Sequence, residues 1–340
     1  MKTQSLSGCS LLALVLAFIV TGTLPLTALD AFQQNARLGR GVNLLGWDAV
    51  WQNRARGQVK DVHFKLIREA GFQHVRINLH PLRDGKPDAN GRLREEFFQI
   101  MDWAVDQALT NQLLAILDFH DDLAISPDPA GKRREFLAAW AAIAEHCKAR
   151  PETVLFEILN EPAPKFTHES WDEYWRGALA IIRKFNPKRT VIIGPAQWNG
   201  VGELDHLNLP ADDRNIIATV HYYNPFPFTH QGTPWTGQKD KTGVTWAGTG
   251  SEMKAVEKDL AKVAQWSEEN KRPIYIGEFG TYEKADMPSR MAWTAHVSRQ
   301  FETQGWSWGF WQFADNFAVF DMRTQKWVEP IRDALIPTNY

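Results

Sequence analysis

Two glutamates each stand beside a short apolar run of the kind that forms a buried β-strand. Glu161 follows the run at 154–159, and Glu278 follows the run at 273–277. A carboxylate in such a place needs hydrogen-bond or charge partners, because burying it without them is costly. Two carboxyl groups facing one glycosidic bond are the usual chemistry of sugar hydrolysis: one protonates the leaving oxygen, and the other attacks or activates water. The pair therefore predicts sugar hydrolysis if the fold brings both glutamates to one cleft.

Other polar and aromatic side chains follow apolar runs in the same way. In chain order they are Arg76, His120 with Asp118, Asp121 and Asp122, Asn160, His221 with Tyr222 and Tyr223, and Trp311. The aspartates around His120 could suggest a metal ion, but their spacing matches neither a catalytic zinc site nor a calcium loop. We therefore expect no metal. The alternatives for Arg76, His221 and Trp311 are a structural ion pair, a hydrogen-bonded core histidine and a core tryptophan.

Tryptophan is the most informative residue type, with 15 in the chain. Its flat ring suits protein cores and also stacks on the apolar faces of sugars. Four tryptophans in strand-end loops are candidate sugar platforms: Trp47, Trp198, Trp235 and Trp246. Packing within the loop is the alternative for each of them. The segment 224–249 is long and rich in Gly and Pro, and long loops in compact domains are often functional.

The elements that must position these residues alternate between β-rich runs and helical patterns. The predicted strands are 41–45, 75–79, 113–119, 154–159, 190–193, 216–221, 273–277 and 306–311. The predicted helices are 61–70, 93–110, 132–149, 170–185, 252–270, 288–303 and 329–335, with a short or poor helix within 200–209. Eight strands alternating with helices favour a single-domain α/β fold, the closed (β/α)8 TIM barrel, over an open sheet. In such a barrel the fourth and seventh strands face each other across the mouth.

The N-terminal region has the layout of a secretory signal. Lys2 precedes an apolar run at 11–20, and small residues follow before position 31. The run is shorter than the about 20 residues of a membrane span. We expect a signal peptide at 1–30, with an uncleaved anchor as the alternative, and a catalytic domain at 31–340. The protein would then be secreted or periplasmic, without stable membrane association, and we expect a monomer.

Charge and cysteine usage narrow the partners further. The net charge is −2, and no block of like charges marks a surface for nucleic acid or membranes. Cys9 lies in the predicted signal, so Cys147 is left alone in the predicted mature chain. An internal disulfide and a thiolate metal cluster are therefore excluded for the mature chain. Cys147 falls in a helical pattern, which predicts a small buried apolar residue.

The combined motifs resemble glycoside hydrolase family 5, the family of many cellulases. They are Val-Arg-Ile at 75–77, Ile-Leu-Asn-Glu-Pro at 158–162, His-Tyr-Tyr at 221–223 and Gly-Glu-Phe-Gly at 277–280. Their order is that of the family, and the resemblance covers the chain from the first predicted strand to the last. It implies a retaining endo-β-1,4-glucanase that acts on cellulose or related β-glucans without a cofactor.

The resemblance also implies roles for individual residues. Glu161 would be the general acid/base and Glu278 the nucleophile, with carboxyl groups about 5–5.5 Å apart. Arg76 would hold Glu278 ionised, and Tyr223 would donate a hydrogen bond to it. The pKa of Glu161 should be raised by burial and by the nearby charge of Glu278. The remaining roles are Asn160 on the sugar 2-hydroxyl, His120 and His221 in the polar floor, Trp311 under the sugar, and His230 and Trp235 beside sugars past the cut.

Several alternatives stay open. β-Mannan, xyloglucan and mixed-linkage β-glucan are alternative substrates, because a few loop contacts decide the choice of sugar. A non-catalytic carbohydrate-binding barrel would keep the aromatic platforms but lose a carboxylate, and both glutamates are present here. A metal-dependent hydrolase on a similar barrel is the third option.

Overall fold

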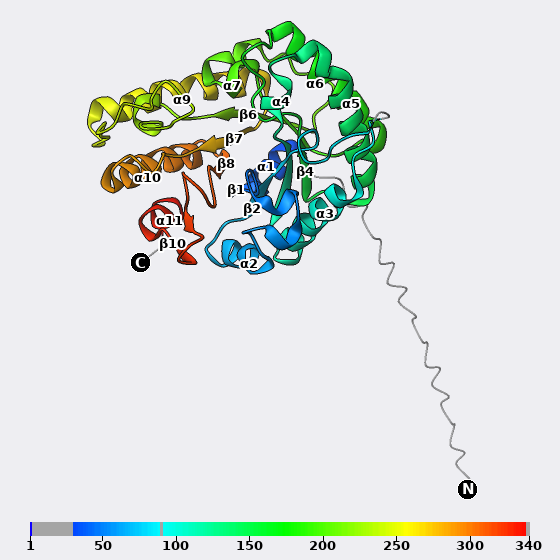
Figure 1. The fold of residues 1–340 in the computed structure, drawn as a ribbon, viewed down its shortest axis with the longest axis horizontal. Helices are drawn as coiled ribbons and strands as arrows, with labels where there is room; N and C mark the ends of the chain where they lie inside the picture. Colours follow the sequence, from blue (N-terminus) through cyan, green and yellow to red (C-terminus); the bar gives the residue numbers. More distant parts are fainter. Residues whose placement is uncertain (2–29, 89–90, 338–340) are drawn as a thin grey trace.

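The closed barrel predicted from the alternating pattern is confirmed. A computed structural model describes residues 1, 30–88 and 91–337 of the chain. Within these ranges eight parallel strands pair in chain order, and β8 closes the barrel on β1. Helices form a ring around the strands (Figure 1). The predicted signal peptide lies outside the described residues, apart from its first and last positions.

The observed elements match the predicted alternation closely. The strands are β1 (Arg40–Leu44), β2 (His74–Leu79), β3 (Leu114–Phe119), β4 (Val154–Glu157), β5 (Val191–Ile193), β6 (Ile216–His221), β7 (Ile274–Phe279) and β8 (Ser307–Phe310). The long helices are α2 (Asp61–Glu69), α3 (Glu95–Thr110), α5 (Pro129–His146), α6 (His168–Phe185), α9 (Gly250–Asn270) and α10 (Met287–Thr303), followed by α11 (Glu329–Leu335). Because helices cover the outside of a barrel filled by side chains, its strands read as nearly continuous apolar runs.

Two strand boundaries differ from the prediction near the glutamates. β4 ends at Glu157, so Glu161 lies in the loop that follows this strand. β7 continues to Phe279, so Glu278 lies within the strand rather than just past it. The sequence pattern did not show this extension, because the apolar run that predicted the strand is interrupted at Gly277 and Glu278.

The pairing of β6 with β7 is irregular beside Glu278. The register shifts between Val220 and His221, so that His221 lies opposite Glu278. Irregularities of this kind redirect a side chain at the rim of a barrel. Gly277 permits the close approach, because a Cβ there would lie 2.9 Å from Oγ1 of Thr219 and 3.0 Å from Nε2 of His221.

Helix α1 (Ala31–Leu38) precedes β1 and was not among the predicted elements. Its N-cap, Asp30, forms a capping box with Gln33, which satisfies free amide groups at the helix start. Ala31 and Leu38 pack with apolar side chains from inside the barrel. The helix therefore covers the N-terminal ends of the strands, opposite the predicted site.

Smaller departures have local causes. Helix α5 starts three residues before the predicted helix because Asp128 caps it and Pro129 suits its first turn. The short elements not predicted are α4 (Asp122–Ile125), α8 (Phe226–Thr229), β9 (Phe320–Asp321) and β10 (Lys326–Trp327), together with 3-10 turns at Ala49–Trp51 and Arg54–Arg56. The poor helix expected within 200–209 is a 3-10 helix, η4 (Val201–His206), preceded by α7 (Ala196–Asn199). The segment Cys147–Ala149 is a 3-10 turn, and Cys147 is buried as predicted.

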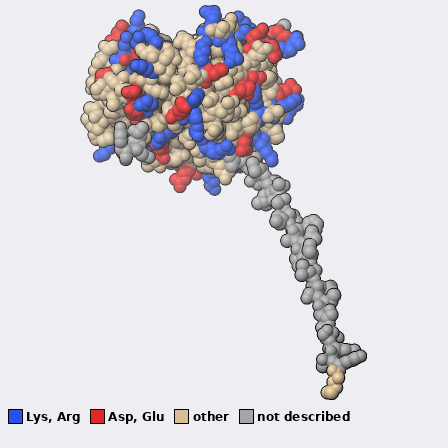
Figure 2. Space-filling view, turned by 90° about the horizontal axis from the view of Figure 1, so that it is seen from below, with Lys and Arg blue, Asp and Glu red and all other residues tan. Residues whose placement is uncertain are grey.

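The distribution of surface charge agrees with the near-neutral net charge of the chain. On the face drawn in Figure 2, basic and acidic side chains are interspersed rather than gathered by sign. In the described part of the chain, no helix has the length and apolar character needed to cross a membrane.

Candidate active site

The two glutamates meet at the C-terminal end of the barrel. One carboxylate oxygen of Glu161, one of Glu278 and a ring nitrogen of His221 all lie within 4.8 Å of one another. Nδ1 of His221 is 2.8 Å from Oε1 of Glu161 and 3.7 Å from Oε2 of Glu278. The fourth and seventh strands lie on opposite sides of the mouth. They thus bring together Glu161 and Glu278, which are 117 positions apart in the sequence.

Arg76 connects Glu278 to the interior of the barrel. Its Nη1 donates to Oε1 of Glu278 at 2.9 Å and to Oδ1 of Asn43 at 2.7 Å. Its Nε and Nη2 donate to both oxygens of Glu157, at 2.7 and 2.9 Å. Nη2 also lies 3.1 Å from Asp118. The fully buried guanidinium is therefore surrounded by three carboxyl groups, which fix its plane and, through it, the position of Glu278.

Glu278 accepts a second hydrogen bond on its other oxygen. The hydroxyl of Tyr223 donates to Oε2 at 2.9 Å. Burial raises the pKa of Tyr223 well above its usual value, and the charge of Glu278 adds to this effect. The hydroxyl therefore stays protonated and remains a donor. Each oxygen of Glu278 thus accepts a hydrogen bond from a group that keeps its proton near neutral pH.

The pKa values of the two glutamates are both raised. Burial raises the pKa of Glu278 to about 7, although His221 and Arg76 act in the opposite direction. Burial likewise raises the pKa of Glu161 to about 7, with Arg76 lowering it and Asp118 raising it further. Arg76 thus favours the ionised form of Glu278, in the expected direction, but desolvation outweighs its charge in the pKa. Burial, rather than the charge of Glu278, is the main cause for Glu161.

Two carboxyl groups this close titrate as a pair. Ionising both would place two negative charges within 4.8 Å, which disfavours loss of the second proton. Among the residues that the structure describes, Glu278 accepts from Arg76 and Tyr223, whereas Glu161 accepts from His221 alone. Hydrogen bonds from donors favour the ionised form. These hydrogen bonds therefore favour the negative charge on Glu278 and the proton on Glu161.

His221 is oriented by a neighbour on α7. Nδ2 of Asn199 lies 3.4 Å from Nε2 of His221, and it also donates to the carbonyl oxygen of Asn160. Burial lowers the pKa of His221, so the ring is neutral. With Nε2 accepting from Asn199, the ring proton is on Nδ1 and points at Glu161. This hydrogen bond leaves Oε2 of Glu161 free of His221.

The floor of the site is a network around His120. Nδ1 of His120 lies 2.6 Å from Asp118, and the ring stacks on Trp311 with centroids 5.4 Å apart and planes 4° from parallel. Asn160 accepts from Arg76 at 2.9 Å and donates to Asp122 at 3.0 Å, which fixes its amide. Each of the three aspartates near His120 thus has at least one hydrogen bond, since Asp121 accepts from the backbone amides of Leu82 and Arg83.

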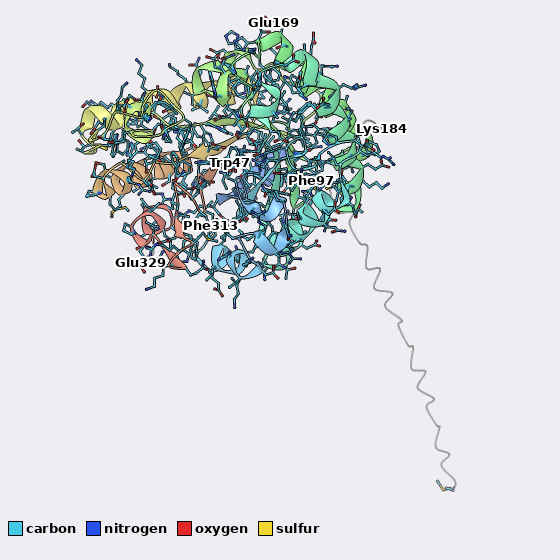
Figure 3. All side chains as sticks on the ribbon, in the orientation of Figure 1. Trp47, Phe97, Glu169, Lys184, Phe313 and Glu329 are labelled. Carbon is cyan, nitrogen blue, oxygen red and sulfur yellow. The ribbon has the colours of Figure 1, made fainter. Side chains whose placement is uncertain are left out.

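A cavity of about 470 Å³ opens above the two glutamates. Its lining includes Trp47, Trp235, Trp311 and His230, so these four predicted sugar contacts face it. A neighbouring cavity of about 700 Å³ lies between the loops after β1, β7 and β8, and Trp47, Gln312, Asp315 and Asn316 line both cavities. Figure 3 shows Trp47 near the middle of the ring of helices. The two cavities therefore adjoin, as parts of one cleft.

Two of the four predicted tryptophan platforms do not line this cleft. Trp246 is 3% exposed, and its ring lies beside His296 on α10 with centroids 5.5 Å apart. The prediction of a sugar platform at Trp246 is wrong, because core packing leaves no free ring face there. Trp198 on α7 is 50% exposed but is absent from the lining of both cavities.

Sequence reasoning missed several residues of the site. Asn43, Glu157 and Asn199 hold Arg76 or His221, yet none was singled out. Asn43 and Glu157 lie inside β1 and β4 and are fully buried. A polar residue inside an otherwise apolar strand is the signal that could have found them, since such a group must have a buried partner.

The fold and the site define the class of protein: a (β/α)8 barrel with paired carboxyl groups at its mouth. The sequence model of the family described as Cellulase (glycosyl hydrolase family 5) matches residues 32–317. The chain belongs to this family.

Known relatives span most of this chain. Endoglucanase H of Acetivibrio thermocellus is 33% identical over 325 residues, which is 92% of this chain and 34% of that protein. Endoglucanase 3 of Fibrobacter succinogenes is 25% identical, and the match covers 87% of this chain and 53% of that protein. The chain thus covers a third to a half of these two relatives.

Among solved structures, Cel5A of Thermotoga maritima in complex with cellobiose is 39% identical, with a TM-score of 0.85. The match covers 90% of this chain and 100% of that one. A complex of Thermotoga maritima Cel5A with mannotriose matches at 38% identity and the same TM-score.

Proposed function

We propose that this protein is a retaining glycoside hydrolase that cleaves internal β-1,4-glucosidic bonds of cellulose or related β-glucans. The observation that carries the proposal is the approach of Glu161 and Glu278 to within 4.8 Å at their nearest oxygens. Retaining glycosidases place their carboxyl groups about 5–5.5 Å apart, whereas inverting enzymes leave about 6.5–9.5 Å for a water molecule. The short distance supports direct attack by one carboxylate.

In the first step, an oxygen of Glu278 forms a bond to the anomeric carbon while the glycosidic C–O bond breaks. Glu161 donates its proton to the departing oxygen, so the leaving sugar departs as a neutral alcohol. The proton is positioned for this step because His221 donates to the other oxygen of Glu161. Arg76 and Tyr223 hold Glu278 so that it can form the covalent ester.

In the second step, ionised Glu161 takes a proton from a water molecule whose oxygen attacks the anomeric carbon. The ester bond to Glu278 breaks, and the carboxylate is restored with its Arg76 and Tyr223 partners. Asn160 holds the sugar 2-hydroxyl through the amide hydrogen that does not bond to Asp122, and Trp311 stacks beneath the ring. His120 keeps Trp311 in place through their parallel contact.

The form of the cleft supports cleavage within a chain rather than at its end. The two adjoining cavities extend from the glutamates over the loops after β1 and β8, with Trp47 between them. Trp235 and His230 lie on the lining of the first cavity. An extended chain can occupy such a cleft on both sides of the cut, which is what internal cleavage requires.

β-Mannan is the second candidate substrate. Its support is the structure of Thermotoga maritima Cel5A with mannotriose, since that protein is 38% identical to this one. We also propose, from the composition and the N-terminal pattern, that the protein is exported as a monomer to the periplasm or the medium after loss of residues 1–30.

A panel of purified polysaccharides with product-length analysis tests the proposal. Carboxymethyl cellulose, mixed-linkage β-glucan, xyloglucan and β-mannan would be compared at equal enzyme concentration. We expect rapid loss of viscosity on β-1,4-glucan, with oligosaccharides of several lengths appearing early. Release of a single short product from the outset would refute internal cleavage, and inactivity on every member would refute the hydrolase.

A further inference from the structure

A second cluster of metal-ligating side chains lies apart from the catalytic residues. His168 is the first residue of α6, and Glu203 and His206 lie on η4. One ligand atom from each side chain lies within 4.8 Å of the other two. The residues come from the segments that follow β4 and β5, so two neighbouring loops at the rim of the barrel mouth supply the set.

The two imidazole rings are arranged face to face. The rings of His168 and His206 stack with centroids 3.9 Å apart and planes 15° from parallel, and Nε2 of His168 is 3.5 Å from Oε2 of Glu203. Within the described ranges, neither ring nitrogen of His206 has a hydrogen-bond partner. Because a metal ion binds in the plane of an imidazole ring, the two stacked rings must swing apart before each can offer a nitrogen to one ion. The side chain of His168 is about one-third exposed and His206 is exposed, so both rings have room to turn.

We infer that His168, Glu203 and His206 form a binding site for a zinc ion, unrelated to the hydrolytic step. Two imidazole nitrogens and one carboxylate, with a water molecule in the fourth position, form an established ligand set for zinc. Imidazole also favours zinc over magnesium or calcium, which prefer oxygen ligands.

The distances require little movement. For three atoms no more than 4.8 Å apart, a point exists within about 2.8 Å of all three, which is 4.8 Å divided by √3. Zinc needs about 2.0–2.2 Å to nitrogen and oxygen. Each ligand atom therefore lies within about 1 Å of a suitable distance, and the two stacked rings must also turn so that a nitrogen lone pair of each points at the ion. The side chains of His168 and Glu203 are about one-third exposed, which leaves room for rotation about their side-chain bonds.

The backbone beneath the cluster is already fixed. Nε1 of Trp171 on α6 donates to the carbonyl of Gly194 at 2.8 Å, and Nη2 of Arg176 donates to that of Asn208 at 2.8 Å. Nε2 of Gln197 donates to the carbonyl of Phe166 at 2.7 Å. These bonds tie α6 and its preceding loop to both ends of the segment that carries Glu203 and His206. The backbone positions that carry the ligands are thus fixed before the metal arrives, which lowers the entropic cost of binding.

The location separates this cluster from the glutamates. Glu169 follows His168 on α6 and interacts electrostatically with both imidazoles, which adds negative charge near the site. Figure 3 shows Glu169 at the outer edge of the ring of helices, whereas Trp47 lies toward the middle. A zinc ion here would join the loops after β4 and β5 and stabilise the folded state without touching the reacting sugar.

The test measures zinc binding by the full-length protein prepared without a histidine tag. Isothermal titration with zinc chloride should give one bound ion per chain, and the melting temperature should rise with zinc but not with magnesium. Because Glu161, His221 and Glu278 form a second group of possible ligands, the Glu278→Gln variant is titrated in parallel. The proposed site requires that this variant still bind one zinc.

The decisive variants are His206→Ala and His168→Ala, with His146→Ala as the matched control. His146 is another partly exposed histidine paired with an acid, Asp102, at 2.8 Å. Zinc affinity should fall at least tenfold in the first two variants and stay unchanged in the control. Loss of the zinc-induced thermal shift should follow the same pattern.

The inference is overturned if the wild type binds no zinc, if His206→Ala binds it as tightly as the wild type, or if Glu278→Gln alone abolishes binding. Circular dichroism shows that each variant is folded. Hydrolysis by His206→Ala is measured separately, so that a failure of the zinc site and a failure of the hydrolase are distinguishable.

Discussion

Replacing Glu161 by Gln separates the two steps of the proposed reaction. Glutamine has nearly the same shape, and its amide oxygen can accept the hydrogen bond from Nδ1 of His221 that is now 2.8 Å long. The variant keeps the site in place but has no proton to donate. General acid catalysis contributes about 10²–10⁴-fold, which corresponds to about 3–5 kcal/mol of barrier height. We expect kcat/KM on β-glucan to fall by that factor.

The leaving group decides how much of the loss appears in the first step. An aryl cellobioside with an acidic phenol needs little protonation, so Glu278 can still form the ester at a useful rate. The second step then lacks its base, and the ester accumulates. Stopped-flow absorbance should show a burst of phenol close to one equivalent per chain, followed by a slow steady state. Activity on polysaccharide within threefold of the wild type would refute the role assigned to Glu161.

Further predictions concern the same residues and the aromatic lining. Glu278→Ala should abolish turnover, and added azide should restore product of inverted configuration, visible by NMR; a retained product would count against this residue as nucleophile. Because the Glu161 and Glu278 pKa values are both about 7, activity should fall in acid as Glu278 is protonated and in base as Glu161 is ionised; a profile flat from pH 5 to 9 would contradict the pair. Trp246→Ala should lower the free energy of unfolding by about 3–5 kcal/mol in urea titrations with KM nearly unchanged, and a variant as stable as the wild type would show that the ring is not core. Trp235→Ala should raise KM for cello-oligosaccharides severalfold while Trp198→Ala should not, and equal effects would place both rings on the cleft.

The barrel could be predicted because its strands are short apolar runs between helical patterns. Most of these runs are rich in Val, Ile, Leu or Phe, and the last, 306–311, contains three tryptophans and a phenylalanine. Strand ends were less accurate, because the rim is where polar residues begin. Glu278 shows this limit, since it belongs to β7 although it follows a glycine that ends the apolar run.

The site could be predicted in its residue types but not in its electrostatics. Arg76, Tyr223 and His221 lie around the glutamates where the strand order placed them. A polar residue inside an apolar strand marks Asn43 and Glu157 as buried, but the sequence does not show that Arg76 is the partner of both. The pKa of Glu278 likewise depends on burial, which outweighs the charge of Arg76.

The tryptophans show why residue type alone does not locate a subsite. Trp47 and Trp246 both lie in loops rich in small residues. Trp47 is 59% exposed over the cleft, whereas Trp246 is packed against α10. Only the path of the long loop after β6 separates the two cases, and that path follows from tertiary contacts rather than from local pattern.

Trapping the covalent intermediate tests the central claim most directly. A 2-deoxy-2-fluoro-cellobioside with an activated leaving group should form the ester quickly and hydrolyse it slowly, because the fluorine destabilises both transition states. Mass spectrometry of the digested protein should then show one sugar per chain, attached to the peptide that contains Glu278. A label on another residue, or hydrolysis with inversion and no label, would contradict a retaining site built from Glu161 and Glu278.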